Sequence, residues 1–374
     1  MGHPTDTATI SLSEQTWSYV GGEYVTRDSG TYFVGGMYVE RYVPATVTQA
    51  FPIVMFHGGA QSGTNYISTP DGRRGWLHDF LLAGFIVYLV DQPERGRSGH
   101  DVVAGAAPKL QRMSVAQVQE RFTACARTGL WPQAVRHTGW PGSGVQGDRY
   151  FDQFFASQVD MLSDRTEIER LTRDCGVALL DEIGPAIVLT HSQSGPFGWL
   201  IADARPGLVK AILSVEPNGP PFRDLKFTGG ERWHSYPAEV ERPYGIARLP
   251  LVFEPALLPG QTLEGSLASP PIDQELAPSY LQHEPARKLP NLAGLKIAIF
   301  TAEASYHAPY DHCTSAFLTQ AGVAHDFILL HERGLRGDGH MVMLERNNHA
   351  VADEMITWLE KALSAECGGA SGVA

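Results

Sequence analysis

The sequence has little of what membrane proteins, nucleic-acid binders and disulfide-rich proteins need. Its longest apolar candidate, Ile183 to Leu189, is far too short to cross a bilayer. Lysine and arginine are scattered, the formal net charge is −12, and no basic stripe is present that could neutralise phosphates. The four cysteines are widely spaced and match no zinc pattern, which favours free thiols. We therefore expect a globular protein with a small-molecule ligand and without a membrane span or a nucleic-acid partner.

The sequence also shows no recognisable signal-peptide pattern in its first residues and no internal repeat. Residues Met1 to Glu14 are polar and have no apolar centre like that of a signal peptide. We therefore expect a cytoplasmic protein, with secretion of a trimmed mature chain as the alternative. Without internal repeats or low-complexity segments, residues 1–374 are interpreted as a single domain.

The order of apolar segments indicates an α/β fold. Two alternating stretches, 16–25 and 30–43, are separated by a turn signal and predict a β-hairpin. Further strands are expected at 51–56, 85–90, 186–190, 209–215, 295–301 and 325–330, and helices at 76–82, 159–183, 197–204, 312–321 and 344–363. Strands that alternate with helices predict a mostly parallel twisted sheet with helices on both faces and the antiparallel hairpin at one edge.

Two irregular insertions interrupt this rhythm, at about 100–157 and 217–290. The first contains clustered aromatic residues and the second is rich in proline. We expect both to fold as a cap over the carboxyl ends of the strands, where open α/β sheets bind ligands. Trp140, Tyr150 and Phe154 are then predicted to bind the substrate. The alternative is that these side chains form a small separate core or the contact of a homodimer.

The strongest chemical signal is the run from Thr190 to Gly195, Thr-His-Ser-Gln-Ser-Gly. A buried strand that ends in Ser192, with a helix directly after it, is typical of a nucleophile on a tight turn. Residues two before and two after such a serine must be small, and here they are Thr190 and Ser194 instead of glycine. Gly195 is expected to provide the missing room. The alternative is that Ser192 or Ser194 only caps the helix.

A nucleophilic serine needs a base and a carboxylate that orients the base. Of the fourteen histidines, His340 is favoured because it lies in the glycine-rich loop between the last strand and the final helix. Glu216 is predicted as the carboxylate, since it ends the strand that follows the serine. The loop after the next strand has no aspartate at the expected position; Glu303 comes slightly early and Asp311 late, and both stay open as alternatives.

The negative charge that forms on the substrate needs two N–H donors. Gln193, the residue after the serine, is predicted to supply one of them. Gly59, in the turn His57-Gly58-Gly59-Ala60 after the first buried strand, is predicted to supply the other, with Ala60 as the alternative. A cluster of His307, His312, Asp311 and Glu303 has no regular ligand spacing, so neither a metal nor another cofactor is expected.

Taken together, these motifs resemble the α/β-hydrolase fold, and in particular a small branch of esterases whose acid is a glutamate after the sixth strand. The resemblance covers the core strands and the run from Gly339 through Asn348 into the last helix, and little of the two insertions. In that branch the oxyanion turn can hold paired cysteines; this chain has Gly59-Ala60 instead, so no role of such a pair is implied.

The resemblance implies a serine hydrolase without a cofactor. Its expected reaction is cleavage of a carboxylic ester or lactone of a small, mostly apolar molecule through an acyl-enzyme intermediate. Acyl transfer, C–C hydrolysis or cyclisation of a metabolite on the same fold are alternatives, and so is a ligand-binding module without catalysis.

Overall fold

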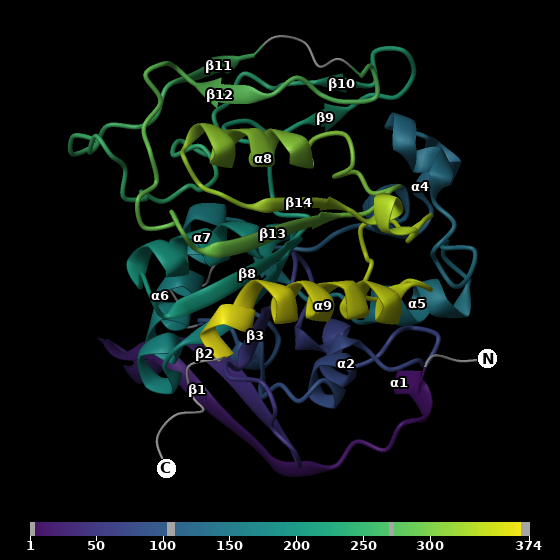
Figure 1. Cartoon of the computed structure of the whole chain (residues 1–374), viewed down its shortest axis with the longest axis vertical. Coiled ribbons are helices and arrows are strands. Elements are labelled where there is room, and N and C mark those ends of the chain that lie inside the picture. Colours follow the sequence, from purple (N-terminus) through teal and green to yellow (C-terminus); the bar gives the residue numbers. More distant parts are fainter. Residues whose placement is uncertain (1–3, 103–108, 269–272, 368–374) are drawn as a thin grey trace.

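The centre of the molecule is a mixed eight-stranded sheet (Figure 1). The computed structural model describes residues 4–102, 109–268 and 273–367. In spatial order the strands are β1 (Leu12–Arg27), β2 (Gly30–Pro44), β4 (Val87–Asp91), β3 (Ile53–Phe56), β7 (Ala186–His191), β8 (Val209–Val215), β13 (Lys296–Thr301) and β14 (Asp326–Leu329). The pairs β1–β2 and β2–β4 are antiparallel, and all later neighbours are parallel. The predicted mostly parallel sheet with a hairpin at one edge is confirmed.

Helices cover both faces of this sheet, which is why β3 and β7 are buried along their whole length. On one face, α2 (Trp76–Leu82) and α9 (Asn348–Cys367) pack into a common apolar core with the strands. On the other face lie α6 (Arg165–Ile183), α7 (Gly195–Ala204) and α8 (Asp311–Gln320). The helices predicted from apolar spacing are therefore present; α2 has the predicted bounds, and the others differ from prediction at one or both ends.

The start of α6 shows why one of these ends shifted. The sequence predicts a helix from residue 159, but α6 begins at Arg165, since the Asp164 side chain accepts hydrogen bonds from the amides of Thr166 and Glu167. Just before this cap, β6 (Met161–Leu162) pairs with β5 (Leu110–Gln111). The cap and the strand pair together make the helix begin later than hydrophobic periodicity indicates.

The two irregular insertions contain only short elements. The first holds α3 (Val115–Val118), a π-helical turn (Gln119–Thr123), α4 (Cys125–Thr128), a 3₁₀ turn (Pro132–Arg136) and α5 (Arg149–Ala156). The second holds β9 (Lys226–Phe227), β10 (His234–Ser235), β11 (Gly265–Leu267) and β12 (Tyr280–Gln282). Residues 103–108 and 269–272 of these insertions lie outside the described part of the chain. The two insertions meet in one apolar cluster that includes Trp131, Leu225 and Trp233.

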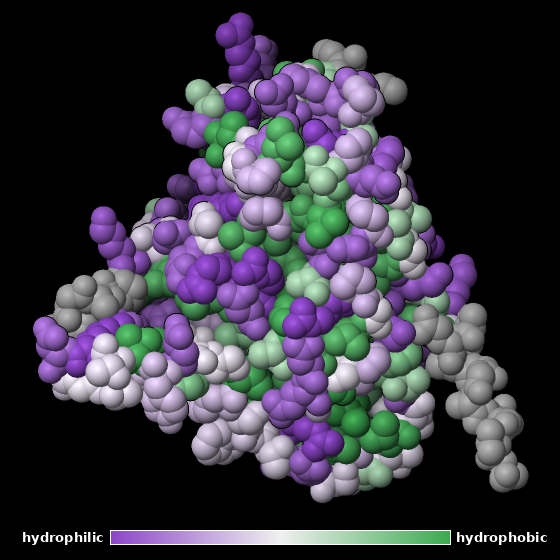
Figure 2. Space-filling model, turned by 90° about the vertical axis from the view of Figure 1, so that its left-hand side faces the viewer, coloured by the Kyte–Doolittle hydropathy of each residue, from purple (hydrophilic) through white to green (hydrophobic). Residues whose placement is uncertain are grey.

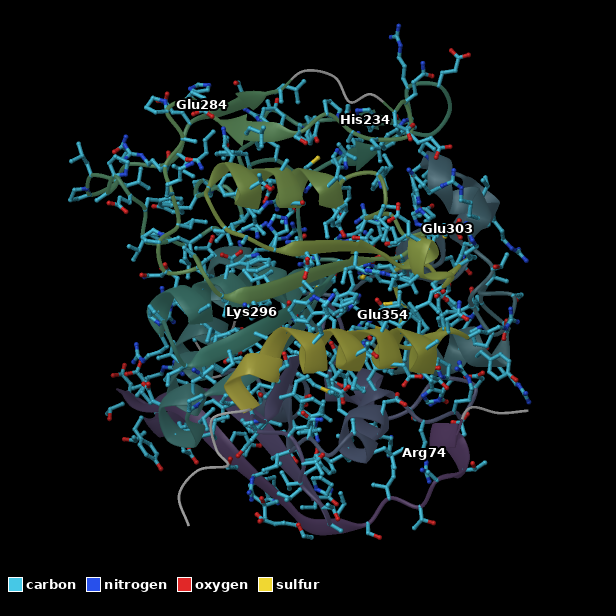
Figure 3. The ribbon with its side chains drawn as sticks, in the orientation of Figure 1. Arg74, His234, Glu284, Lys296, Glu303 and Glu354 are labelled. Carbon is cyan, nitrogen blue, oxygen red and sulfur yellow. The ribbon has the colours of Figure 1, made fainter. Side chains whose placement is uncertain are left out.

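The carboxyl ends of the parallel strands all point to one side of the molecule. Figure 3 labels Lys296 at the start of β13 and Glu303 just beyond its end, so this side is on the right, where Figure 1 shows α4 and α5. Figure 2 shows the opposite side, on which hydrophobic residues form scattered groups among hydrophilic ones. Within the described residues, none of the helices has the length and apolarity of a membrane span.

Candidate active site

Ser192 lies at the tip of a tight turn between β7 and α7. β7 ends at His191, a single 3₁₀ turn covers Ser192–Ser194, and α7 starts at Gly195. The φ angle of Ser192 is +56°, a left-handed conformation that side chains other than asparagine and aspartate rarely adopt. Such strain is concentrated at functional sites, and here it projects the serine from the end of its strand.

Two glycines provide the room that this turn needs. A Cβ atom on Gly195 would lie 2.6 Å from the Cβ of Pro217, so helix α7 and the loop after β8 touch at a point that only glycine allows. The methyl group of Thr190 faces Gly198, where a Cβ would lie 3.3 Å away. The bulk that Thr190 adds on the strand is therefore offset by a missing side chain one turn into the helix.

The two neighbouring serines have different surroundings. Ser194 is fully buried, and its hydroxyl lies 2.9 Å from the carbonyl oxygens of Phe56 and His191 and accepts a hydrogen bond from the His191 amide. Ser192, by contrast, lines a cavity of about 280 Å³. Of these two hydroxyls, only that of Ser192 is placed to contact a ligand.

Glu216 and His340 form a fully buried pair beside this cavity. His340 Nδ1 lies 2.5 Å from Glu216 Oε2. The same carboxylate accepts hydrogen bonds from the Ser305 hydroxyl (2.7 Å) and from the Ala302 amide (2.8 Å). Glu216 also has a positive φ of +48°, directly after β8. The three hydrogen bonds fix the carboxylate, and the carboxylate in turn fixes which ring nitrogen of His340 faces the cavity.

Burial decides the titration of this pair. It lowers the pKa of His340 well below the usual range, and the nearby rings of His191 and His307 act in the same direction. Burial, followed by the Asp311 carboxylate, raises the pKa of Glu216, whereas the hydrogen bonds from Ser305 and Ala302 lower it. The imidazole is therefore kept neutral, which is the form that can accept a proton.

The alternative acids make other contacts. Glu303 forms an ion pair with Arg336 (3.0 Å) and accepts a hydrogen bond from the Gly337 amide. Asp311 is paired with His307 at 2.8 Å and also accepts a hydrogen bond from the Thr301 hydroxyl. Of the three candidate carboxylates, the structure brings only Glu216 to His340.

Three buried groups are close enough to suggest a metal site. Potential ligand atoms of His191, Glu216 and His340 lie within 4.8 Å of one another. His191 Nε2, however, donates to the His340 carbonyl oxygen at 3.0 Å, and Glu216 and His340 are bonded to each other. These hydrogen bonds account for the cluster without an ion.

Tyr306 is a neighbour of His340 that sequence reasoning missed. Its hydroxyl lies 3.4 Å from His340 Nε2. Burial raises the pKa of this hydroxyl to about 12, whereas the charge of Arg121 and, after it, the Ser192 side chain lower it. The residue belongs to the loop after β13, which the sequence presents only as a loop without the expected aspartate. The tyrosine in this loop, which follows a buried strand, is the feature of the sequence that could have pointed to Tyr306.

The turn that contains Gly58 and Gly59 is held from behind by a buried arginine. Arg95 donates to the carbonyl oxygens of Gly58 (3.4 Å) and Gln61 (3.3 Å) and to Gln193 Oε1 (3.1 Å). Burial lowers the pKa of Arg95 to about 9, so the side chain stays charged at neutral pH. Both predicted donor residues, Gly59 and Gln193, line the cavity together with Ser192.

The aromatic residues predicted to bind substrate are not in the cavity wall. Trp140 and Phe154 are buried, pack against each other at a ring distance of 5.4 Å and belong to the apolar core shared with α2 and α9. Tyr150 is half-buried, with the guanidinium of Arg149 4.4 Å from its ring. The aromatic residues that do line the cavity are Phe122, Phe197, Phe227, Tyr306 and Tyr310. The expectation was based on aromatic content, which does not tell which face of a loop a ring occupies.

Comparisons with known proteins agree with this fold. No family model matches the sequence. Over 352 residues the chain is 42% identical to a protein named probable secreted lipase phiG, from Fungal sp. (strain ATCC 74256), and the match covers 90% of this chain and 92% of that protein. A solved structure described as a novel bacterial esterase has a TM-score of 0.65 and 22% identity, and covers 96% of this chain and 99% of that one. The similarity to this solved structure shows the fold.

The first relative also corrects one prediction. A cytoplasmic protein was expected from the polar residues 1–14, but a relative that matches most of the chain is named as secreted. The expectation of a cytoplasmic protein is therefore wrong, because the polarity of one short segment does not decide where a protein acts. The homodimer stays a prediction.

Proposed function

The chain belongs to the ester-hydrolysing serine enzymes of the α/β-hydrolase fold, and on that premise we propose that Ser192 is its nucleophile, His340 its general base and Glu216 the acid behind the base. The protein is a carboxylic ester hydrolase. The observation that carries the assignment of residues is the 2.5 Å contact between His340 Nδ1 and Glu216 Oε2, formed beside a serine on a strained turn.

In the proposed reaction, His340 Nε2 removes the hydroxyl proton while Ser192 Oγ attacks the carbonyl carbon of the ester. Glu216 stabilises the imidazolium that forms and keeps its Nδ1–H in place. The imidazolium then gives its proton to the departing alcohol, which leaves an acyl group on Ser192. Water, activated by the same histidine, releases the acid and restores the free serine.

The oxyanion is proposed to bind to the amides of Gly59 and Gln193. A trans peptide holds its C=O and N–H on opposite sides. The Gly58 carbonyl accepts hydrogen bonds from Arg95 and from His57 Nδ1 (2.9 Å), and Arg95 lies outside the cavity wall. The Gly59 N–H of the same peptide is thereby turned the other way, which supports its role as a donor to the substrate.

The two insertions are proposed to act as a cap over this site. Residues of both insertions line the cavity with Ser192, among them Phe122 in the first and Leu225 and Phe227 in the second. A volume of about 280 Å³ with these apolar side chains fits a small ester or lactone. Secretion is proposed as well, on the strength of the named relative alone.

Replacement of Ser192 by alanine tests the proposal. We expect Ser192→Ala to lose about a thousandfold or more in kcat and to resist labelling by a fluorophosphonate, because the oxyanion donors alone give little rate. Ser194→Ala is the matched control: it removes a buried structural hydroxyl, and we expect a lower melting temperature with labelling retained. Turnover and labelling of Ser192→Ala at the wild-type level would contradict the assignment.

A further inference from the structure

The wall of the cavity is unusually basic for so acidic a chain. The formal net charge of the whole protein is −12. The charged residues that line the cavity are nevertheless four arginines and two carboxylates, namely Arg112, Arg121, Arg165, Arg248, Glu169 and Asp224. Local charge, more than net charge, decides which ligand a cleft attracts.

All but one of these arginines are neutralised by a carboxylate. Arg165 pairs with Asp224 at 3.0 Å and Arg248 with Glu169 at 3.0 Å. Arg112 pairs with Asp160 at 2.6 Å. Arg121 has neither an ion pair nor a hydrogen bond to any residue in the described part of the chain; its guanidinium carbon lies 5.8 Å from the centre of the Tyr306 ring. One positive charge in the wall is therefore left for a ligand.

A π-helical turn places this charge next to the proposed reacting atoms. The turn spans Gln119–Thr123 and is closed by a hydrogen bond from the Ala124 amide to the Gln119 carbonyl oxygen (2.9 Å). It brings Phe122 onto His340, with the rings stacked 5.2 Å apart, and Arg121 onto Tyr306, whose hydroxyl lies 3.4 Å from His340 Nε2. Single π turns of this kind are frequent at functional sites.

We propose that Arg121 binds a free carboxylate of the substrate, so that the preferred substrates are esters or lactones carrying a second acid group. The inference rests on the proposed function, because it places the ester carbonyl at Ser192. A guanidinium matches a carboxylate in shape and can donate two parallel hydrogen bonds to it. A single unpaired arginine suits one planar monoanion better than a phosphate, which needs several donors. The hydrocarbon part of such a substrate would face Phe122, Leu225 and Phe227.

A matched pair of substrates isolates the charge. The 4-nitrophenyl half-ester of adipic acid and its methyl ester, 4-nitrophenyl methyl adipate, differ only in the free carboxylate. A second pair carries the carboxylate on the alcohol side, as butyrate esters of 4-hydroxybutyric acid and of its methyl ester. For each pair the measured quantity is the ratio of kcat/KM for the acid to kcat/KM for the neutral ester, after subtraction of spontaneous hydrolysis.

In at least one pair we expect the ratio to fall about fivefold in Arg121→Gln and further in Arg121→Glu, since Arg121 is exposed and an exposed ion pair contributes modestly. Added salt should lower the wild-type ratio in the same pair. Arg127→Gln is the control: Arg127 is an exposed arginine of the neighbouring helix α4 outside the cavity wall, and the ratio should not change.

Unchanged ratios in both pairs for both Arg121 variants would overturn the proposal, and an equal fall in Arg127→Gln would do the same. Ser192→Ala is run in parallel, which separates the two hypotheses. If Ser192→Ala is inactive and the ratios stay constant, only the carboxylate site is wrong. If Ser192→Ala still turns over the neutral esters, the proposed nucleophile itself is wrong.

Discussion

Two buried histidine–carboxylate pairs lie face to face at the carboxyl edge of the sheet. The N–O distance is 2.5 Å between His340 and Glu216 and 2.8 Å between His307 and Asp311. The two imidazole rings are stacked 4.7 Å apart with 9° between their planes, and all four side chains are buried. They differ in access: His340 lines the cavity with Ser192, and His307 does not. A histidine paired with an acid thus identifies a base only together with the space in front of it.

The aromatic side chains of the first insertion show the same difference. All three rings are buried in the core shared with α2 and α9, but only Phe122, which stacks on His340, also lines the cavity, in contrast to Trp140 and Phe154. The side chains compared are all aromatic. Position relative to the cavity decides whether a ring can affect substrate choice or only stability.

The sharpest test of the comparison replaces the acid of each pair by its amide. Glu216→Gln should lower kcat about a thousandfold, because the neutral amide no longer stabilises the imidazolium or fixes the ring of His340. Asp311→Asn should keep kcat within about tenfold of wild type, because its histidine does not reach the cavity. Steady-state kinetics on protein shown to be folded by circular dichroism provides the measurement. A larger loss in Asp311→Asn, or in Glu303→Gln, would reverse the assignment.

Arg95 allows a second test, of a group that acts from behind the cavity wall. Arg95→Met should lower kcat about ten- to a hundredfold with a smaller change in KM, because the Gly58 carbonyl and the Gln193 side chain lose their common donor. Arg97→Met is the control: Arg97 pairs with Asp91 and Glu40, so its loss should lower the melting temperature and leave kcat nearly unchanged. Equal kcat losses in both variants would show that only stability is affected.

The aromatic residues allow a third test, on selectivity. Phe122→Ala should change the preference between short and bulky acyl esters about tenfold, since it enlarges the cavity beside His340. Trp140→Ala and Phe154→Ala should cost about 3–5 kcal/mol of stability with little change in preference, because both side chains are in the core. Chain-length profiles and denaturant unfolding measure the two effects. Altered preference in all three variants would place the core rings in the pocket.

The smallest expected effect is in the pH profile. Burial lowers the pKa of His340, so its protonation requires a lower pH and the acid limb of kcat/KM should lie below about 6.5, the ordinary pKa of histidine. The measurement is kcat/KM for a neutral ester between about pH 4 and about pH 8, a range that includes the acid limb on both of its sides. An acid limb at or above the ordinary pKa of histidine would mean that the negative charge of Glu216 raises the pKa of His340 by more than burial lowers it.

The sequence predicts those parts of the site that depend on short stretches of chain. Ser192 and Glu216 each end a buried strand, and His340 lies between the last strand and the last helix, so local patterns were enough to propose them. Arg95 and Tyr306 were missed, because their roles depend on contacts with residues far along the chain; Arg95 and Gln193 are 98 positions apart. Trp140 and Phe154 were misplaced for a related reason: the packing of an irregular segment is set by tertiary contacts that leave no periodic signal.

The contact between Gly195 and Pro217 has a consequence for finding relatives of this protein by motif. A search for G-x-S-x-G passes over the chain, although the turn itself is built in the usual way. What the turn requires is space, and here the space comes from residues 195 and 198, which gives the pattern T-x-S-x-S-G-x-x-G over residues 190–198. Homologues with threonine at the first position should therefore retain glycine at the last, and homologues that lose the glycine at 195 should also change the residue that follows their catalytic acid.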